Sequence, residues 1–128
     1  METDKYYTPE IEEFHVGFEY ENQHDRHHIF NWEDKVFKKS SKLSKIKQKL
    51  LENKIRVAYL DKENIESLGW IQRDYDTYDI EGYALELNNE YHTYIYQTGP
   101  HNGTVFKGII KNKSELKRLM QQLKIQNA

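Results

Sequence analysis

The fold of this chain is decided by residues 83–125, YALELNNEYHTYIYQTGPHNGTVFKGIIKNKSELKRLMQQLKI. Residues 83–87 alternate in side-chain character with the period of a half-buried strand. Asn88-Asn89 then predicts a hairpin turn, because asparagine tolerates the positive φ that tight turns need. Residues 91–97 are rich in Tyr, Thr and Ile, which favour a pleated surface. This stretch therefore begins as two antiparallel strands.

The length of the turn decides which side chains of the return strand share a face with Leu85. A two-residue turn places the even-numbered residues from His92 to Tyr96 on that face. A three-residue turn places the odd-numbered residues from Tyr91 to Ile95 there instead. The sequence is compatible with both registers.

A third strand and a helix complete this stretch. A loop rich in Gly and Pro precedes a strand over 104–110, in which Gly108 permits a bulge or a close approach of the backbone. Asn112 predicts a helix N-cap, and Glu115 can reach back as in a capping box. A helix over 113–124 follows from one apolar stripe at i, i+3, i+4 and i+7. The members of that stripe are Leu116, Leu119, Met120 and Leu123.

The N-terminal half also reads as strands around one helix. Residues 1–8 are expected to be a lead-in, and residues 14–20 alternate aromatic with polar side chains as a strand, with a bend or bulge at Gly17. A second strand is predicted over 29–37. An amphipathic helix with lysines on its polar faces is predicted over 41–53.

The middle of the chain contains shorter elements. Residues 55–59 alternate as a strand, and Asp61 is expected to cap a short helix whose left-handed end suits Gly69. Trp70 opens another strand. Residues 74–79 are expected to form an acidic, tyrosine-rich connection.

Together these elements predict an α+β fold in a single domain, 1–128. Its mostly antiparallel sheet has five to seven strands, and the two main helices, near 41–53 and 113–124, pack on one face. The opposite face, or its edge beside the loops at 74–81 and 98–104, is the expected binding surface.

Composition excludes several classes of protein. The 128 residues include 17 aromatic ones (10 Tyr, 5 Phe and 2 Trp), which argues against disorder. The absence of cysteine excludes disulfides, thiol catalysis and zinc–thiolate sites. No apolar run approaches the ~20 residues of a membrane helix, and the acidic N-terminus is unlike a signal peptide. The protein is therefore expected to be soluble and cytoplasmic.

The net charge of −2 hides a strong segregation of charge. Residues 1–25 carry eight negative groups and one positive, whereas 38–56 carry one negative and eight positive. Residues 57–97 carry nine negative and two positive, and 98–128 carry one negative and six positive. Such blocks predict either a cationic face opposite an anionic one or neutralisation across strand pairs.

Three stretches carry a family resemblance: YTPEIEEFHVGFEYE at 7–21, IRVAYL at 55–60 running into IESLGW at 65–70, and FKGIIKNKSEL at 106–116. They resemble short, mostly uncharacterised proteins encoded by bacteriophages and mobile elements of gut anaerobes. The resemblance covers under half of the chain. It implies a phage or mobile-element origin, and hence the cytoplasm of a host cell, and it assigns no catalytic residues.

Candidate ligand-binding residues come from three patterns. The lysine-rich helix can follow phosphates, and exposed tyrosines offer stacking faces for bases. The loop Gly99–Thr104 can turn backbone amides toward a phosphate, although it lacks the GxxxxGK[ST] pattern and an ordinary hairpin loop explains it equally. The expected ligand-binding residues are Lys42, Lys45, Lys49, Tyr75, Tyr78, Tyr94, Tyr96, His101 and Thr104.

Metal and catalytic patterns are weaker. His24, His27 and His28 could ligate zinc or nickel, but no matching HxxH or HExxH spacing follows, so a solvated loop is expected and neither metal nor cofactor. His15, His92 and His101 could converge in a small hydrolase or nuclease that also uses carboxylates.

The sequence favours a non-catalytic, phage-encoded binding protein that captures a nucleotide-like small molecule or a host defence protein. One alternative is a virion or assembly component, which predicts a homo-oligomer. The histidine-based hydrolase or nuclease is the other.

Overall fold

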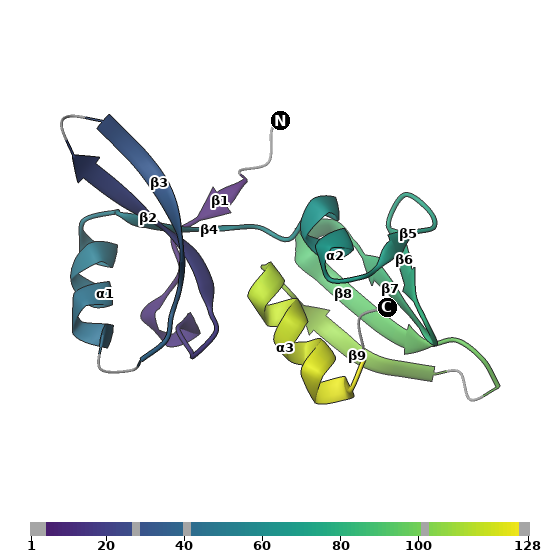
Figure 1. Cartoon of the computed structure of the whole chain (residues 1–128). Coiled ribbons are helices and arrows are strands. Elements are labelled where there is room, and N and C mark those ends of the chain that lie inside the picture. The colour runs from purple at the N-terminus through teal and green to yellow at the C-terminus, as the bar shows by residue number, and fades with distance from the viewer. Residues whose placement is uncertain (1–4, 27–28, 40–41, 101–102, 126–128) are drawn as a thin grey trace. The chain divides into compact units, whose positions relative to one another are not determined.

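The backbone pairs its strands into two separate antiparallel sheets (Figure 1). The structure is a computed structural model that describes residues 5–26, 29–39, 42–100 and 103–125. Its internal contacts divide the chain into two compact units, an N-terminal unit of residues 1–59 and a C-terminal unit of residues 60–128. Each unit has its own sheet and its own apolar core.

The N-terminal unit is a four-stranded sheet with strand order β1-β4-β2-β3 and one main helix. Its elements are β1 (Tyr6–Tyr7), the 3₁₀ turn η1 (Ile11–Glu13), β2 (Glu19–Arg26), β3 (Ile29–Val36), α1 (Leu43–Leu51) and β4 (Ile55–Ala58). The buried core joins α1 and the loop around η1 to the inner face of the sheet, as hydrophobic burial requires. Its buried members are Phe14, Phe18, Phe37, Ile46, Ile55 and Val57.

The C-terminal unit is a five-stranded meander in which every strand pairs with its neighbour in sequence. Its elements are α2 (Lys62–Ser67), β5 (Ile71–Gln72), β6 (Thr77–Ile80), β7 (Tyr83–Leu87), the turn η3 (Asn89–Tyr91), β8 (His92–Gln97), β9 (Gly103–Ile109) and α3 (Lys113–Leu123). Residues of α2 and α3 bury one face of this sheet. Inside that core the indole nitrogen of Trp70 donates to the sulfur of Met120 at 3.3 Å. The other face, which carries Tyr94 and Tyr96, is uncovered by these helices.

The helix caps predicted at Asn112 and Asp61 are confirmed, whereas Ser40-Ser41, the predicted cap of the helix over 41–53, lies outside the described residues. Asn112 accepts a hydrogen bond from the Glu115 backbone nitrogen at 2.8 Å, and Asp61 accepts one from Asn64 at 2.8 Å. The Glu115 carboxylate reaches back to the backbone nitrogen of Lys111 at 2.9 Å. Gly69 ends α2 with φ of +103°, the left-handed conformation expected of it.

The predicted α+β class with antiparallel pairing is confirmed, but the prediction of one sheet with both main helices on one face is wrong. α1 packs in the core of the first sheet, and α3 packs in the core of the second. The reason is long-range pairing: β1 pairs with β4 and closes the first sheet before the meander begins. The expectation of a single domain over residues 1–128 stays a prediction.

The predicted strand over 14–20 is wrong in its first half. Gly17 has φ of +95°, and the chain turns there, with the Phe18 nitrogen bonded to the His15 carbonyl at 2.9 Å. The turn buries both Phe14 and Phe18 and leaves Val16 71% exposed, so β2 begins only at Glu19. An aromatic core thus overrides the alternating pattern. The expected lead-in also differs, since its residues Tyr6–Tyr7 form β1.

The β7–β8 hairpin has the three-residue turn. Asn88 donates to the His92 carbonyl at 2.8 Å, and Leu85 pairs with Ile95. Glu90 and Tyr91 adopt positive φ of 59° and 63° within the turn. Thr93 and Ile95 consequently face the core, each 0% exposed.

Two smaller expectations are settled further along this sheet. The connection predicted over 74–79 is shorter, because Thr77–Ile80 forms β6. Gly108 is a site of close approach: a Cβ built there would lie 2.9 Å from the Phe106 ring. The bulge in this strand lies at Val105, between the pairs Ile95–Phe106 and Tyr96–Thr104.

Candidate functional site

The C-terminal unit carries a depression where two connections of its sheet lie side by side. The Leu87 nitrogen donates to the Asp76 carbonyl at 2.9 Å, which ties the β5–β6 connection to the β7–β8 turn. The depression has a volume of about 630 Å³, within the usual range for small-ligand sites. We call it the tyrosine depression. Its lining residues are Tyr75, Asp76, Tyr78, Leu87, Asn88, Asn89, His92 and Tyr94.

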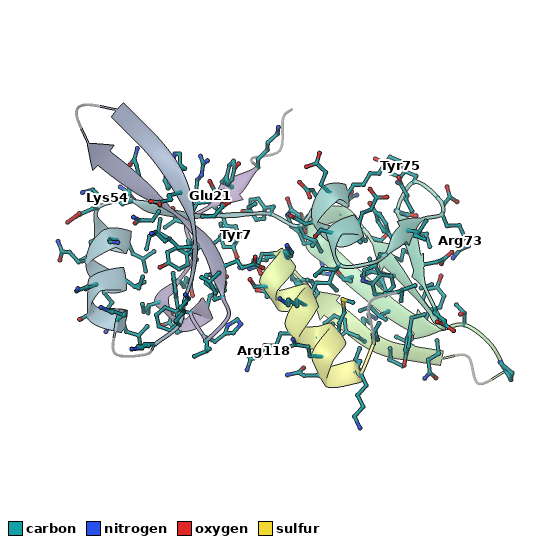
Figure 2. All side chains as sticks on the ribbon, viewed as in Figure 1. Tyr7, Glu21, Lys54, Arg73, Tyr75 and Arg118 are labelled. Carbon is teal, nitrogen blue, oxygen red and sulfur yellow. The ribbon has the colours of Figure 1, made fainter. Side chains whose placement is uncertain are left out.

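Hydrogen bonds fix the backbone of the β5–β6 connection and leave one ring outside. The Asp74 carboxylate accepts from the Tyr75 nitrogen at 2.7 Å, and the Gln72 amide donates to the Tyr75 carbonyl at 3.2 Å. Asp76 accepts from the Thr77 hydroxyl at 3.1 Å. The Tyr75 side chain, labelled in Figure 2, is 91% exposed at this end of the sheet. A rigid backbone therefore presents an accessible ring.

The hairpin register presents the second ring. Because Thr93 and Ile95 face the core, His92 and Tyr94 point to the uncovered face. His92 is exposed and Tyr94 is half-buried. The Lys107 ammonium lies 5.7 Å from the Tyr94 ring centroid, near the outer limit of a cation–π contact.

Tyr78 contributes the third ring from the core side. It pairs with Leu85 on β7 and is only 4% exposed, yet it lines the depression. Burial raises the pKa of the Tyr78 hydroxyl, and the nearby charges of Glu66, Asp61 and Asp76 raise it further. The hydroxyl makes no hydrogen bond to the residues that the structure describes.

Tyr96 lies on the same uncovered face but outside the depression. It pairs with Thr104 on β9, which is exposed. Arg73 donates to Asp79 at 2.8 Å, and its pKa is raised by that hydrogen bond and then by one to Tyr96. The ion pair is exposed and is thus a weak contribution to stability.

The N-terminal unit holds a second constellation that sequence reasoning missed. The Arg56 guanidinium carbon lies 3.7 Å from the Tyr6 ring centroid and 4.1 Å from that of Trp32. Two of its nitrogens donate to one Glu21 oxygen at 2.9 and 3.2 Å. We call these four residues the arginine clamp. They come from four strands and lie far apart in the sequence, so no local pattern indicates them.

No protein-family model matches this chain, and neither the curated proteins nor the solved structures compared with it match.

The structure distributes the expected ligand-binding residues unevenly. Tyr75, Tyr78 and Tyr94 meet in the tyrosine depression, whereas Tyr96 and Thr104 lie beside each other elsewhere on the sheet. The lysines lie on or at the start of α1 in the N-terminal unit, with Lys42 and Lys45 exposed and Lys49 half-buried. His101 lies outside the described residues.

The sequence did not single out four polar lining residues as ligand-binding: Asp76, Asn88, Asn89 and His92. Asn88-Asn89 was predicted only as a turn, and His92 only as a possible catalytic group. The signal that could have found them is the hairpin itself, because two turns at one end of a meander bring their polar residues together.

The metal and histidine hypotheses depend on histidines of which the structure describes only some. His27 and His28 lie outside the described residues. Among the described ranges, no group of three or more His, Asp or Glu residues is placed to hold a metal ion. His15 and His92 belong to different units. Within the same ranges, no helix is both long and apolar enough to cross a membrane.

Proposed function

We propose that this chain is a non-catalytic binding protein of phage or mobile-element origin, and that the tyrosine depression is its recognition site. One observation carries the proposal: Tyr75, Tyr78 and Tyr94 come from separate elements and converge on one depression. Tyrosine offers a large apolar face and a polar edge, which suits recognition. The origin is the part that the N-terminal sequence resemblance supports.

The surrounding groups support selective binding. The amides of Asn88 and Asn89 each provide donors and an acceptor at the rim, and Asp76 provides a carboxylate. Leu87 adds an apolar wall. A few polar groups around an apolar and aromatic surface are the usual composition of a ligand pocket.

Two partners are compatible with the aromatic lining, a nucleotide-like small molecule and a host defence protein. Charge favours the protein. Asp76 lines the depression, and Asp61 and Glu66 act on the Tyr78 hydroxyl, so a phosphate would meet negative potential. The lysines predicted to follow phosphates, Lys42, Lys45 and Lys49, belong to the N-terminal unit, and in the C-terminal unit Lys107 lies 5.7 Å from the Tyr94 ring centroid. We therefore propose that the partner is a host protein that places a side chain in the depression.

The experiment is an NMR titration of the ¹⁵N-labelled full chain with two probe sets. One set holds cyclic and adenine-ribose nucleotides, and the other holds short peptides of basic, acidic and aromatic composition. We expect a peptide class to shift the amide signals of Asn88, Asn89 and His92. The same peptide at 100 times its Kd should stabilise the fold by about 2.7 kcal/mol.

Two variants locate the binding. Tyr94→Ala removes a ring from the depression and should weaken binding at least tenfold. Tyr96→Ala removes a half-buried ring from the same strand, two residues away and outside the depression, and should leave binding unchanged. The proposed function is wrong if no probe moves these signals, or if Tyr94→Ala binds as tightly as the unmodified chain.

A further inference from the structure

The tyrosine depression is lined by a residue whose hydroxyl group is not satisfied by any described residue, Tyr78. Tyr78 is only 4% exposed, and its hydroxyl forms no hydrogen bond within the described ranges. The residue as a whole is buried, but its hydroxyl oxygen retains solvent contact, so a hydrogen-bond donor from outside the fold can reach it. Because Tyr78 lines the depression, a ligand that enters it can reach the hydroxyl.

The charge around that hydroxyl is negative. Asp61, Glu66 and Asp76 all act on Tyr78. The Asp61 carboxylate accepts a hydrogen bond from the Asn64 backbone nitrogen, and the Asp76 carboxylate accepts one from the Thr77 hydroxyl. Both donors are neutral, so neither carboxylate charge is compensated. None of the three forms an ion pair with a described residue. The depression thus combines an unpartnered hydroxyl with one lining carboxylate, Asp76, and the charges of Asp61 and Glu66 act on the same hydroxyl from α2 and its cap.

The arginine clamp shows how this chain satisfies the same set of groups elsewhere. There two aromatic rings and the carboxylate of Glu21 surround one guanidinium at 2.9–4.1 Å. In the depression, Lys107 approaches Tyr94 at 5.7 Å, and the described residues place no cation over Tyr75 or Tyr78. The depression therefore has the rings and the carboxylate of such a site and lacks its central cation.

We propose that the group held in the tyrosine depression is an alkylammonium ion, supplied by a lysine side chain of the partner protein. This inference rests on the proposed function, because it names the ligand chemistry of the same site. The ammonium would donate to Asp76 and to the oxygen of Tyr78, and its charge would be stabilised by the tyrosine rings. Leu87 and the rings would cover the apolar stem.

The test is the same NMR titration with four small probes of known chemistry. They are N-acetyl-lysine methylamide, its trimethyllysine and norleucine counterparts, and adenosine monophosphate. We expect the two cationic probes to shift the signals of Asn88, Asn89 and His92, and the neutral norleucine probe to bind at least tenfold more weakly. Butylamine and a lysine-containing peptide then separate a free amine from a protein side chain as the source.

Charge-matched variants identify the carboxylate. Asp76→Asn should weaken the lysine probe about tenfold. Glu81→Gln removes the same charge from an exposed residue in the β6–β7 turn, outside the lining, and should leave the affinity unchanged. Superimposable spectra of the free variants would show that both fold normally.

The outcomes separate this inference from the function on which it rests. If the lysine and norleucine probes bind equally, or if adenosine monophosphate binds more tightly in the depression, the proposal of an alkylammonium ligand is wrong. The proposal that the depression is a binding site is not affected by that result. Equal losses of affinity for the lysine probe in Asp76→Asn and Glu81→Gln would show that Asp76 does not bind the ammonium group. If no probe or peptide moves the signals of the depression, the inference and the proposed function both fail.

Discussion

The arginine clamp and the tyrosine depression both contain aromatic rings and a carboxylate, but only the clamp encloses a cation of its own. In the clamp, Arg56 lies between two rings and donates to Glu21, so the rings, the cation and the carboxylate satisfy one another. In the depression, three rings and Asp76 line a volume of about 630 Å³, and the Tyr78 hydroxyl lacks a partner among the described residues. A surface of aromatic rings and carboxylates therefore stabilises the fold when a cation of the same chain occupies it, as Arg56 does. The same kind of surface can recognise a ligand when no such cation is present.

Exposure supports this distinction. The side chains of Arg56 and Glu21 are 26% and 19% exposed, which shields the ion pair from solvent and strengthens it. Tyr75 is 91% exposed, so its ring makes little contribution to the core. A residue that costs little to remove from the fold is available for binding.

The largest effect is expected from a core substitution that asks whether the two units melt together. Leu85→Ala removes a side chain that is 0% exposed and pairs across the sheet with Tyr78 on one side and Ile95 on the other, and it should cost about 2–5 kcal/mol. Each unit contains one tryptophan, Trp32 or Trp70, so fluorine NMR of 5-fluorotryptophan reports on each unit separately. A single domain predicts that both signals shift to lower denaturant together.

The contrary result would be a Trp70 signal that moves alone. The comparison would then be between two independent domains, and ligand binding to the depression would leave the stability of the arginine clamp unchanged.

The clamp itself should rank second. Arg56→Ala removes two cation–π contacts and leaves Glu21 without its partner, which should cost about 2–3 kcal/mol in denaturant unfolding. Arg56→Lys should recover only part of the loss, because an ammonium cannot stack as a planar guanidinium does. Arg118→Ala is the matched control: Arg118 is exposed on α3 and should change stability by under about 0.5 kcal/mol. Equal losses at both arginines would show that the clamp is not stabilising.

The helix caps should rank third, and they also differ between the units. Asn112→Ala removes the side-chain cap of α3 and should cost about 1 kcal/mol. Lys42 occupies the corresponding position of α1 without a side-chain cap bond, so Lys42→Ala should change stability by under about 0.5 kcal/mol. Chemical unfolding of both variants measures the difference. A cost for Lys42→Ala as large as that for Asn112→Ala would contradict the assigned caps.

Local features of this fold could be predicted from the sequence because their physical cause lies within a few residues. The caps at Asp61 and Asn112 and the left-handed Gly69 are of this kind. The hairpin register could not be chosen, since both turn lengths satisfy the alternation. The positive φ values of Glu90 and Tyr91 that decide it are costly for such residues, and no local signal announces them.

Features that depend on distant pairing could not be predicted. The division into two sheets requires Tyr6–Tyr7 to pair with β4 about fifty residues later. The arginine clamp likewise requires Glu21 and Arg56 to meet, 35 positions apart. At the candidate site, Tyr75, Tyr78 and Tyr94 were proposed from residue type alone. Their convergence with Asp76 depends on two connections meeting at one end of the sheet, which no motif records.

The smallest effect is expected from alkaline titration, which compares one tyrosine in each unit. Burial alone raises the pKa of Tyr20, whereas burial and then Glu66, Asp61 and Asp76 raise that of Tyr78. Both folded pKa values lie above the ordinary value of 10.0, so the stability that each contributes is present below pH 10 and is lost as pH rises through the folded pKa. Glu66→Gln should lower the pKa of Tyr78 toward 10 and leave Tyr20 unchanged.

Carbon-13 NMR of ring-labelled tyrosine measures both pKa values in one titration, and Glu63→Gln provides the control. Glu63 is exposed on the same helix and does not act on Tyr78, so its loss should move neither pKa. A Tyr78 pKa that stays constant in Glu66→Gln would mean that the negative potential does not reach the Tyr78 hydroxyl. Glu66 and Asp61, which act from α2 and its cap, would then no longer favour a lysine ligand in the depression. Asp76 would remain as the single carboxylate available to a ligand. The depression and the arginine clamp would then share only tyrosine rings beside one carboxylate.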